Sequence, residues 1–276
     1  VMAEDICDRL ESVNRDFPAV LELSAQGGAL LTEARARPGL ATRLGFWTQT
    51  DFSARALPST AADTGRAVVD EEALPFAEGR FNLVVAAGGL HWVNDLPGLM
   101  LQVRRLLHPD GLFIGALFGA GTLRELRECL LAAEAELTGG AAARVSPFAD
   151  AQDMASLLQR AGFALPVSDV DTRVVRYANP ARLLADLRGM GETAALAARP
   201  HRYLRPDVIA RAIALYAERF ADPDGKVRAS FNIVTATGWA PHESQQQPLR
   251  PGSAKTRLAD ALGVVERSAG QKSTDS

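Results

Sequence analysis

A chain of 276 residues, 47% of them hydrophobic, can bury a sizeable core and fits one large domain or one domain with a small addition. Its net charge of −3 provides no excess of Lys and Arg to neutralise a phosphate backbone, which argues against a nucleic-acid partner. No apolar run approaches the ~20 residues of a spanning helix, which argues against stable membrane insertion. Cys7 and Cys129 are too few for a disulfide framework or a zinc site. We therefore expect a cytoplasmic protein with two reduced, partly buried thiols and no metal.

The first half of the chain alternates between apolar runs typical of buried strands and segments with the helical period. Each predicted strand is followed by a polar turn, as in a repeating unit of one strand and one helix. In chain order we expect a helix over 6–13, strands over 18–23 and 45–51 with a helix over 29–35 between them, a short helical piece at 53–57, strands over 67–69 and 81–87, a helix over 96–107, a turn at 108–111 and a strand over 112–118.

The second half is richer in helices. The pattern predicts helices over 123–137, 150–161, 180–187 and 206–220, strands over 167–177 and 227–238, and a tight turn at 222–225. Seven strands separated by helices favour an α/β fold with a mostly parallel sheet and helices on both faces. We assign residues 1–240 to this domain, with helical additions at 122–165 and 178–222 over its cleft. The Gln- and Pro-containing stretch 241–276 is expected to be a mostly irregular tail.

Polar residues follow several of the predicted strands. Ligands of parallel sheets bind beyond the carboxyl ends of the strands, so Asp51, Asp70 and Glu71 are candidates for lining a pocket. Asp51 follows Gly28 at close to the ~20-residue spacing at which an acid meets ribose hydroxyls in nucleotide sites. The alternative is that Asp51 caps a helix beginning at Ser53.

The turn after the first strand, Ser24-Ala25-Gln26-Gly27-Gly28, is a weak form of a phosphate-style glycine turn. Such turns need glycines because the backbone must turn tightly and approach the ligand closely. The alternative is that this turn only joins strand to helix. His91 is a weak candidate for a general base, and Trp92 offers a stacking face. The more ordinary alternative is that both side chains pack at the start of the next helix.

The order of these pieces resembles the class I S-adenosylmethionine-dependent methyltransferases. Glu22 matches the acid of that family's first motif, Ser24 and Gln26 stand in place of its first two glycines, and Gly28 matches the third. The resemblance implies a Rossmann-like sheet with an antiparallel last strand, S-adenosylmethionine as cofactor, S-adenosylhomocysteine as product and methyl transfer to an unidentified acceptor. The cofactor-binding residues that it implies are Glu22, Ser24, Gly28, Asp51 at the ribose, Phe52 against the adenine, Asp70 and Glu71 near the adenine amino group, and Ala87 and Leu90 near the sulfonium.

Further motifs resemble one subgroup, the bacterial relatives of the mitochondrial complex I assembly factor that hydroxylates an arginine, and more distantly the malonyl carrier-protein methyltransferases of biotin synthesis. These motifs include Arg144-Val145-Ser146-Pro147-Phe148 and Asp186-Leu187-Arg188-Gly189-Met190-Gly191. The subgroup implies an alternative function as a protein hydroxylase or assembly factor acting on a respiratory-complex subunit. A third alternative is a degenerate, non-enzymatic member, because Ser24 and Gln26 add bulk where that family has glycines.

Overall fold

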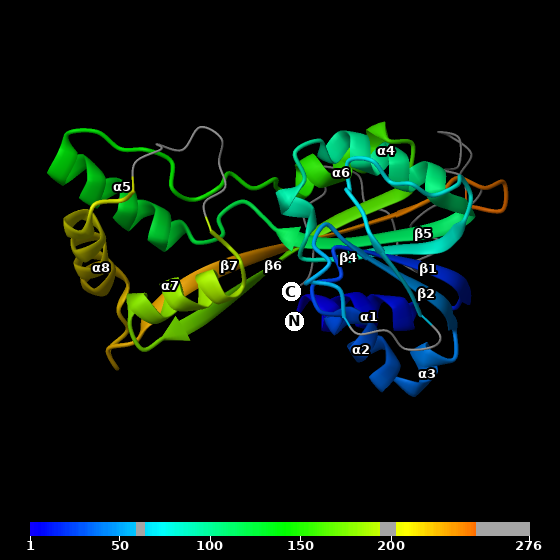
Figure 1. The fold of residues 1–276 in the computed structure, drawn as a ribbon, viewed down its shortest axis with the longest axis horizontal. Helices are drawn as coiled ribbons and strands as arrows, with labels where there is room; N and C mark the ends of the chain where they lie inside the picture. The colour runs from blue at the N-terminus through cyan, green and yellow to red at the C-terminus, as the bar shows by residue number, and fades with distance from the viewer. Residues whose placement is uncertain (59–63, 194–202, 247–276) are drawn as a thin grey trace, which may run out of the picture. The chain divides into compact units, whose positions relative to one another are not determined.

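The computed structural model describes residues 1–58, 64–193 and 203–246. Its helices and strands follow the alternation expected from the sequence (Figure 1). In chain order they are α1 (Met2–Ser12), β1 (Phe17–Leu23), α2 (Ala29–Ala36), α3 (Pro38–Ala41), β2 (Leu44–Asp51), β3 (Thr64–Val68), β4 (Phe81–Ala87), the 3-10 helix η1 (Leu90–Trp92), α4 (Leu96–Leu106), β5 (Leu107–Phe118), α5 (Arg124–Thr138), α6 (Ala151–Arg160), β6 (Ala164–Tyr177), α7 (Pro180–Gly189), α8 (Pro206–Phe220) and β7 (Val227–Trp239).

The described strands form one seven-stranded sheet in the order β3-β2-β1-β4-β5-β7-β6. Strands β1 to β5 pair in parallel, and β7 runs antiparallel to both β5 and β6. The predicted α/β fold with an antiparallel last strand is therefore confirmed. Chain order reverses between β1 and β4, where Leu23 lies beside Ala86. In open sheets of this kind, such a reversal leaves a crevice beyond the carboxyl ends of the two strands.

Two hydrophobic clusters hold helices against the faces of the sheet. One joins α4 and α6 to β1, β4 and β5 through fully buried side chains such as Leu99, Met154 and Phe113. The other joins α1, α2 and α3 to the opposite face through Leu10, Leu30 and similar residues. Side chains point to alternate faces of a strand, so the apolar runs of β1 and β4 supply both clusters.

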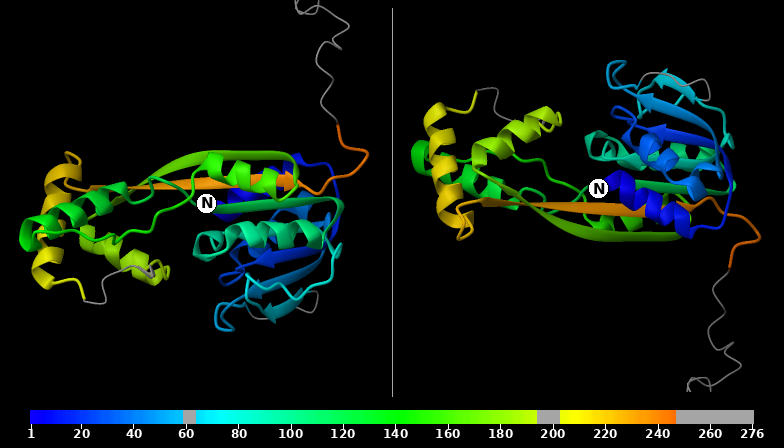
Figure 2. Two further views of the ribbon diagram at one scale, coloured as in Figure 1. Left: turned by 90° about the horizontal axis from the view of Figure 1, so that it is seen from above. Right: turned by 90° about the horizontal axis from the view of Figure 1, so that it is seen from below.

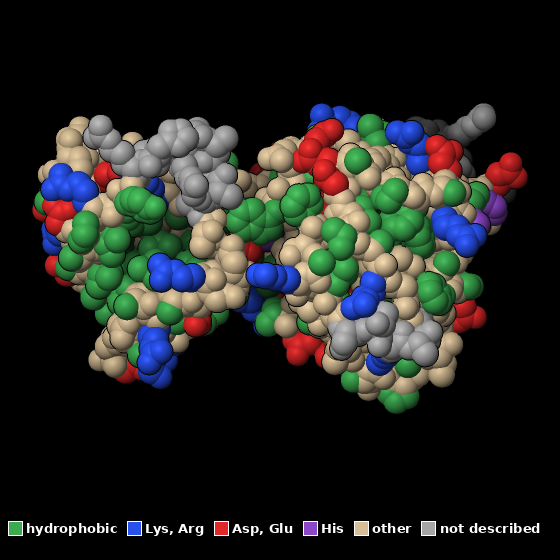
Figure 3. Space-filling view, viewed as in Figure 1, with side chains coloured by type: hydrophobic (Ala, Val, Ile, Leu, Met, Phe, Trp, Pro, Cys, Tyr) green, Lys and Arg blue, Asp and Glu red, His purple; other side chains and the backbone are tan. Residues whose placement is uncertain are grey.

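A third cluster lies away from this sheet core. It contains buried residues of α5, α7, α8 and the ends of β6 and β7, including Cys129, Leu183, Tyr216 and Val227. The long β6 and β7 hairpin extends from the sheet core to this cluster, and Figure 2 shows the three helices gathered at its far end. Figure 3 shows hydrophobic side chains on the surface of this helical group. The fold thus places a helical addition beside the sheet without interrupting strands β1 to β5.

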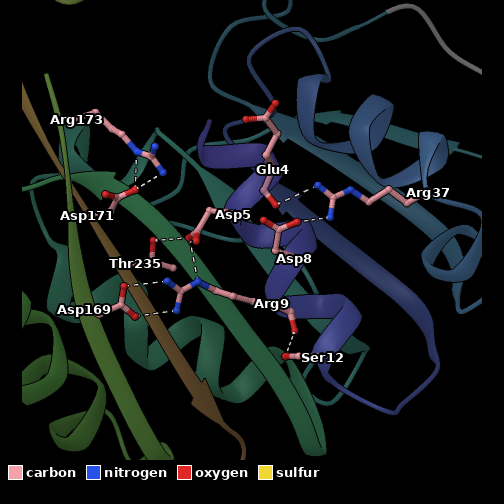
Figure 4. A network of polar contacts seen from close by, with 10 residues as sticks. All are labelled: Glu4, Asp5, Asp8, Arg9, Ser12, Arg37, Asp169, Asp171, Arg173 and Thr235. Atoms are coloured by element: carbon pink, nitrogen blue, oxygen red, sulfur yellow. Dashed lines mark hydrogen bonds and ion pairs between the residues drawn. The ribbon is translucent and has the colours of Figure 1, made fainter. Parts of the chain in front are cut away.

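Polar contacts fix α1 to the sheet (Figure 4). Arg9 Nη1 and Nη2 donate to the two carboxylate oxygens of Asp169 in β6, at 2.7 and 2.8 Å. Arg9 Nε donates to Asp5 Oδ2 at 2.9 Å. The same Asp5 oxygen accepts the hydroxyl of Thr235 in β7 at 2.9 Å. Bidentate pairing of arginine with a carboxylate also fixes orientation. These bonds hold α1 in register with β6 and β7, and Met2 at its start lies in the cleft described below.

Three local predictions are wrong. Residues 53–57 form bends and turns instead of a helix, because the Asp51 carboxylate accepts the Ser53 amide at 2.9 Å and closes a local turn. Strand β3 begins at Thr64, earlier than the predicted 67–69. The segment 108–111 belongs to β5 instead of a turn, and Asp110 takes the left-handed conformation (φ 65°) where the pairing with β4 shifts register.

Both cysteines are free and buried, which raises the pKa of the Cys7 thiol to about 12 and that of Cys129 to about 11.

Residues 1–241 form one compact unit. The predicted tail lies mostly outside the described residues. Within the described residues, every helix is too short or too polar to cross a membrane.

Candidate functional site

A cleft of about 1170 Å³ opens beyond the carboxyl ends of β1 to β5. Each strand supplies it with the residues that follow the strand, and the loop after α7 borders it as well. The residues that line it are Met2, Ser24, Gln26, Asp51–Ser53, Ala56, Asp70–Glu72, Ala87–Gly89, Trp92–Asn94, Phe118 and Gly189–Thr193. The site therefore lies at the chain reversal between β1 and β4.

Most of the residues expected at a cofactor site from the sequence meet in this cleft. Six of them line it: Ser24, Asp51, Phe52, Asp70, Glu71 and Ala87. Glu22, Gly28, Leu90 and His91 do not line the cleft. Leu90 is fully buried in the core against the sheet, and Gly28 begins α2 in the left-handed conformation (φ 79°). A Cβ on Gly28 would lie 3.0 Å from Pro58, so this position tolerates little side chain.

The turn after β1 keeps a glycine-like backbone at two positions that are not glycine. Ser24 and Gln26 have φ angles of 49° and 43°, in the left-handed region that glycine favours. The Ser24 hydroxyl donates to the Glu71 carboxylate at 2.9 Å, and Gln26 Nε2 donates to the Gly88 carbonyl at 3.3 Å. A Cβ on Gly89 would lie 2.1 Å from the Ser24 Cβ, so the turns after β1 and β4 are in close contact. These side chains join the strand ends across the cleft.

Gln26→Gly is expected to be about 1 kcal/mol more stable than Gln26→Ala. Both variants lose the side-chain bond to Gly88. Alanine keeps a Cβ in the left-handed conformation, which costs about 1 to 2 kcal/mol. The greater freedom of glycine in the unfolded chain offsets part of this difference in stability. Urea unfolding of the two variants measures the difference. Equal stabilities would show that the turn relaxes away from this conformation.

Asp51 holds the ends of two turns at once. Its Oδ1 accepts the Ser53 amide at 2.9 Å and its Oδ2 accepts the Gln26 amide at 3.2 Å. The side chain is mostly buried, with 8% of the residue exposed, and lines the cleft. A carboxylate has about four lone-pair positions, so two remain to accept hydroxyl groups of a ligand. Asp51 can therefore organise the site and contact a ligand.

The acidic loop after β3 is tied to the turn after η1. Glu72 Oε1 accepts two amides, from Asn94 at 2.8 Å and Asp95 at 3.3 Å, as well as the Asn94 side chain at 3.0 Å. These bonds stabilise the charged form and hold the pKa of the Glu72 carboxyl below its usual range. Asp70 Oδ1 accepts the Glu72 amide at 2.9 Å, which fixes the loop locally. Asp70 is exposed and lines the cleft.

Glu22 has a different place from the one expected. It is 1% exposed, and its Oε2 accepts the indole of Trp47 and the amide of Gln49, both at 2.8 Å. Burial raises the pKa of its carboxyl to about 7, against the lowering effect of these two bonds. Glu22 joins β1 to β2 beneath the turn and does not reach the cleft.

His91 packs behind the cleft. Its side chain is 3% exposed, its Nε2 is 2.9 Å from Glu192 Oε1, and its ring lies 5.2 to 5.8 Å from the rings of Trp92, Phe118 and Phe148. His91 Nδ1 is buried and has no hydrogen-bond partner among the described residues. The ring therefore connects η1 to the loop after α7, while Trp92 and Phe118 reach the cleft itself.

Sequence reasoning missed several lining residues. Phe118 ends β5, so the rule that ligands lie beyond strand ends would have found it. Met2 and Glu192 come from α1 and from the loop after α7, and no local pattern in the sequence places either of them at the strand ends.

Charge is distributed unevenly in the cleft. Asp51, Asp70, Glu71, Glu72 and Glu192 line it, whereas none of its described lining residues is Lys or Arg. Low-dielectric walls that carry one sign of charge favour ligands of the opposite sign. The described residues contain no group of three or more His, Cys, Asp or Glu side chains placed to hold a metal ion. The acidic lining thus favours a cationic ligand.

Comparison with known families is consistent with this geometry. The family model described as a methyltransferase domain matches residues 2–166, which include the carboxyl ends of β1 to β5 around the cleft. The chain belongs to the methyltransferase domain family. The solved structure of the YcgJ protein from Bacillus subtilis shares its fold, with a TM-score of 0.58, 12% identity, and coverage of 87% of this chain and 99% of that one.

Two relatives of this chain are named for different activities. Human arginine-hydroxylase NDUFAF5, a mitochondrial protein, is 40% identical over 263 residues, which cover 94% of this chain and 74% of that protein. The malonyl-[acyl-carrier protein] O-methyltransferase of Halorhodospira halophila is 36% identical over 170 residues, covering 62% of this chain and 56% of that protein. The resemblances expected from the sequence are confirmed.

Proposed function

We propose that the cleft binds S-adenosylmethionine and that the enzyme transfers its methyl group to an acceptor, with S-adenosylhomocysteine as product. The observation that carries this proposal is the position of Asp51, which ends β2 at the cleft with lone pairs to spare for ribose hydroxyls. The residue that ends β2 is the usual ribose contact in nucleotide sites of open parallel sheets.

The residues present fit this cofactor in charge as well as in hydrogen bonding. S-adenosylmethionine carries a sulfonium, an ammonium and a carboxylate group, so its net charge is positive, and the cleft has five acidic lining residues. Phe52 is 70% exposed beside Asp51, where its ring can cover an adenine, and Asp70 can accept from the adenine amino group. We assign the ligand's sulfonium end to the side formed by Ala87 and Gly88.

The cofactor supplies an electrophilic methyl group, and the chain supplies alignment. Methyl transfer depends mainly on positioning the nucleophile against the methyl carbon. Trp92, Phe118 and Met190 line the cleft with apolar groups, and Glu192 adds a carboxylate among them. An acceptor that enters from this side meets a negatively charged, partly apolar surface.

A second candidate is hydroxylation of a protein arginine, for example on a respiratory-complex subunit. The observation that favours it is coverage, since the arginine-hydroxylase relative aligns with 94% of this chain and the malonyl O-methyltransferase with 62%. The acidic lining suits a guanidinium group and opposes a malonyl carboxylate. This reaction would require oxygen and a reductant in addition to the chain. Location in the cytoplasm stays a prediction from the sequence.

The deciding experiment begins with calorimetric titration of the full chain with S-adenosylmethionine and S-adenosylhomocysteine. We expect micromolar binding of both ligands. Incubation of an arginine-containing peptide with labelled S-adenosylmethionine, or with oxygen and a reductant, then separates a methyl gain from an oxygen gain by mass spectrometry. Absence of binding would contradict the proposal and favour the non-enzymatic alternative.

Glu192→Gln is expected to increase the dissociation rate of S-adenosylhomocysteine severalfold. The 2.9 Å contact between His91 and Glu192 holds the loop 189–193 at the cleft, and glutamine keeps the shape but weakens a charge-assisted bond. Stopped-flow fluorescence of Trp92 in the cleft gives the rate, with Glu78→Gln at an exposed site as control. An unchanged rate would show that this loop does not gate release.

A further inference from the structure

The outer edge of β6 is open over an unusual length. β6 is the last strand of the sheet and pairs only with β7 among the described strands. It is 14 residues long, and both views of Figure 2 show it as the border of the sheet. An edge strand presents a row of unpaired backbone N–H and C=O groups, which natural proteins usually keep short or cover.

The side chains on this edge are suited to burial. Val170, Val174 and Val175 are 48%, 53% and 40% exposed. All five residues 172–176 are exposed although they belong to a strand, so both faces of β6 are open there. Arg173 and Asp171 lie between these valines and pair with each other at the surface. This surface therefore combines β-branched side chains, one charge of each sign and backbone groups that pair with no other strand among the described residues.

We propose that β6 pairs with β6 of a second copy of this chain, antiparallel and about a twofold axis at Thr172. The two sheets then join into one continuous sheet, and the interface is the same surface on both copies. Such an axis is perpendicular to the sheet, so residues opposite each other must lie on the same face. Because faces alternate along a strand, the axis must lie between the two strands level with one residue, which then faces its own copy, and not level with the bond between two residues.

Charge complementarity favours Thr172 as the residue level with the axis. With Thr172 there, Asp171 of each copy faces Arg173 of the other, Val170 faces Val174, and the two Thr172 side chains face each other. An axis at Asp171 or at Arg173 would place two like charges directly opposite, and an axis at Val170 would place Asp169 opposite Asp171. Opposite charges across strands stabilise pairing, and like charges weaken it. The sequence of β6 is thus complementary to itself about Thr172.

The ends of the strand limit the paired segment. Pro166 lacks an amide hydrogen, and the pairing of β6 with β7 is irregular between Ala164 and Val167. At the other end, Arg176 is engaged by Asp222 and Asp224 of its own chain. Pairing over residues 168–176 fits between these limits and is centred on Thr172.

Sedimentation velocity of the full chain over a range of concentrations tests the proposal, with a concentration-dependent dimer as the expected result. Asp171→Arg and Arg173→Asp each place like charges opposite at two positions, so each variant alone is expected to dissociate at least tenfold more readily. Mixed together, the two variants restore opposite charges at every position and are expected to form a heterodimer. Both side chains are about half exposed, so these reversals leave the fold of one copy intact.

Asp16→Arg is the matched control, because it makes the same charge change at an exposed site before β1 and is expected to keep the dimer. Three results would overturn the proposal: a monomer at all concentrations for the unmodified chain, a dimer that Asp171→Arg leaves unchanged, or a mixture of the two variants that stays monomeric. Far-ultraviolet circular dichroism and thermal unfolding of each variant confirm that only association has changed.

Discussion

Replacing Asp51 with alanine is expected to weaken binding of S-adenosylhomocysteine about a hundredfold. The variant loses the carboxylate that we assign to the ribose, and charge-assisted hydrogen bonds contribute about 1.5 to 3 kcal/mol each. It also leaves the amides of Gln26 and Ser53 without their acceptor, which loosens the turns after β1 and β2. Calorimetric titration of the unmodified chain and the variant gives the ratio of the two dissociation constants.

The ligand itself provides the control that separates these two effects. A 2′-deoxy analogue of S-adenosylhomocysteine lacks one ribose hydroxyl, so it is expected to bind the unmodified chain more weakly than the parent ligand does. Asp51→Ala is expected to bind the two ligands nearly equally, because the acceptor is gone. If the variant weakened both ligands by the same factor, Asp51 would act through the turns and not on the ribose.

The sequence predicted the strand ends well and the contacts beneath them poorly. Asp51, Asp70 and Ala87 come together because each one follows a parallel strand, and the carboxyl ends of such strands share one edge. Glu22 was expected at the same edge, yet its side chain is buried on a face of the sheet, where it accepts a hydrogen bond from Trp47. The face of the sheet on which a side chain lies depends on how β1 pairs with its neighbouring strand, and the sequence of β1 alone does not specify that pairing.

Long-range contacts and one local hydrogen bond explain the other differences. Glu192 reaches His91 across 101 positions of sequence, and no local period records such a pairing. Residues 53–57 have helical spacing, but the Asp51 side chain bonds their first amide and favours a turn. Gln26 occupies a conformation typical of glycine, held there by bonds to Asp51 and Gly88. Tertiary contacts override local preference at Glu192 and Gln26, whereas the bond from Asp51 to Ser53 is local, and Glu192, Gln26 and Ser53 all border the cleft.

Glu22→Gln is expected to make the protein more stable at pH 8 and to flatten the pH dependence of its stability. Burial raises the pKa of the folded Glu22 carboxyl to about 7, whereas its usual value is 4.5. The folded state therefore binds a proton that the unfolded state releases between these values. Its contribution is fully present below about pH 4.5 and is lost as the pH rises through 7, a change of about 2 to 3 kcal/mol between pH 5 and pH 8.

Glutamine is neutral at every pH in this range, and its amide oxygen can still accept from Trp47 and Gln49. Urea unfolding at pH 5 and pH 8 measures the free energy of both proteins, with Glu78→Gln at an exposed carboxylate as the matched control. A pH dependence in Glu22→Gln as steep as that of the unmodified chain would show that Glu22 is ionised in the folded state at both pH values. Glu22 lies beneath the Ser24 turn and does not line the cleft. Glu22→Gln is therefore also expected to bind the ligand as tightly as the unmodified chain does, at pH 5 and at pH 8.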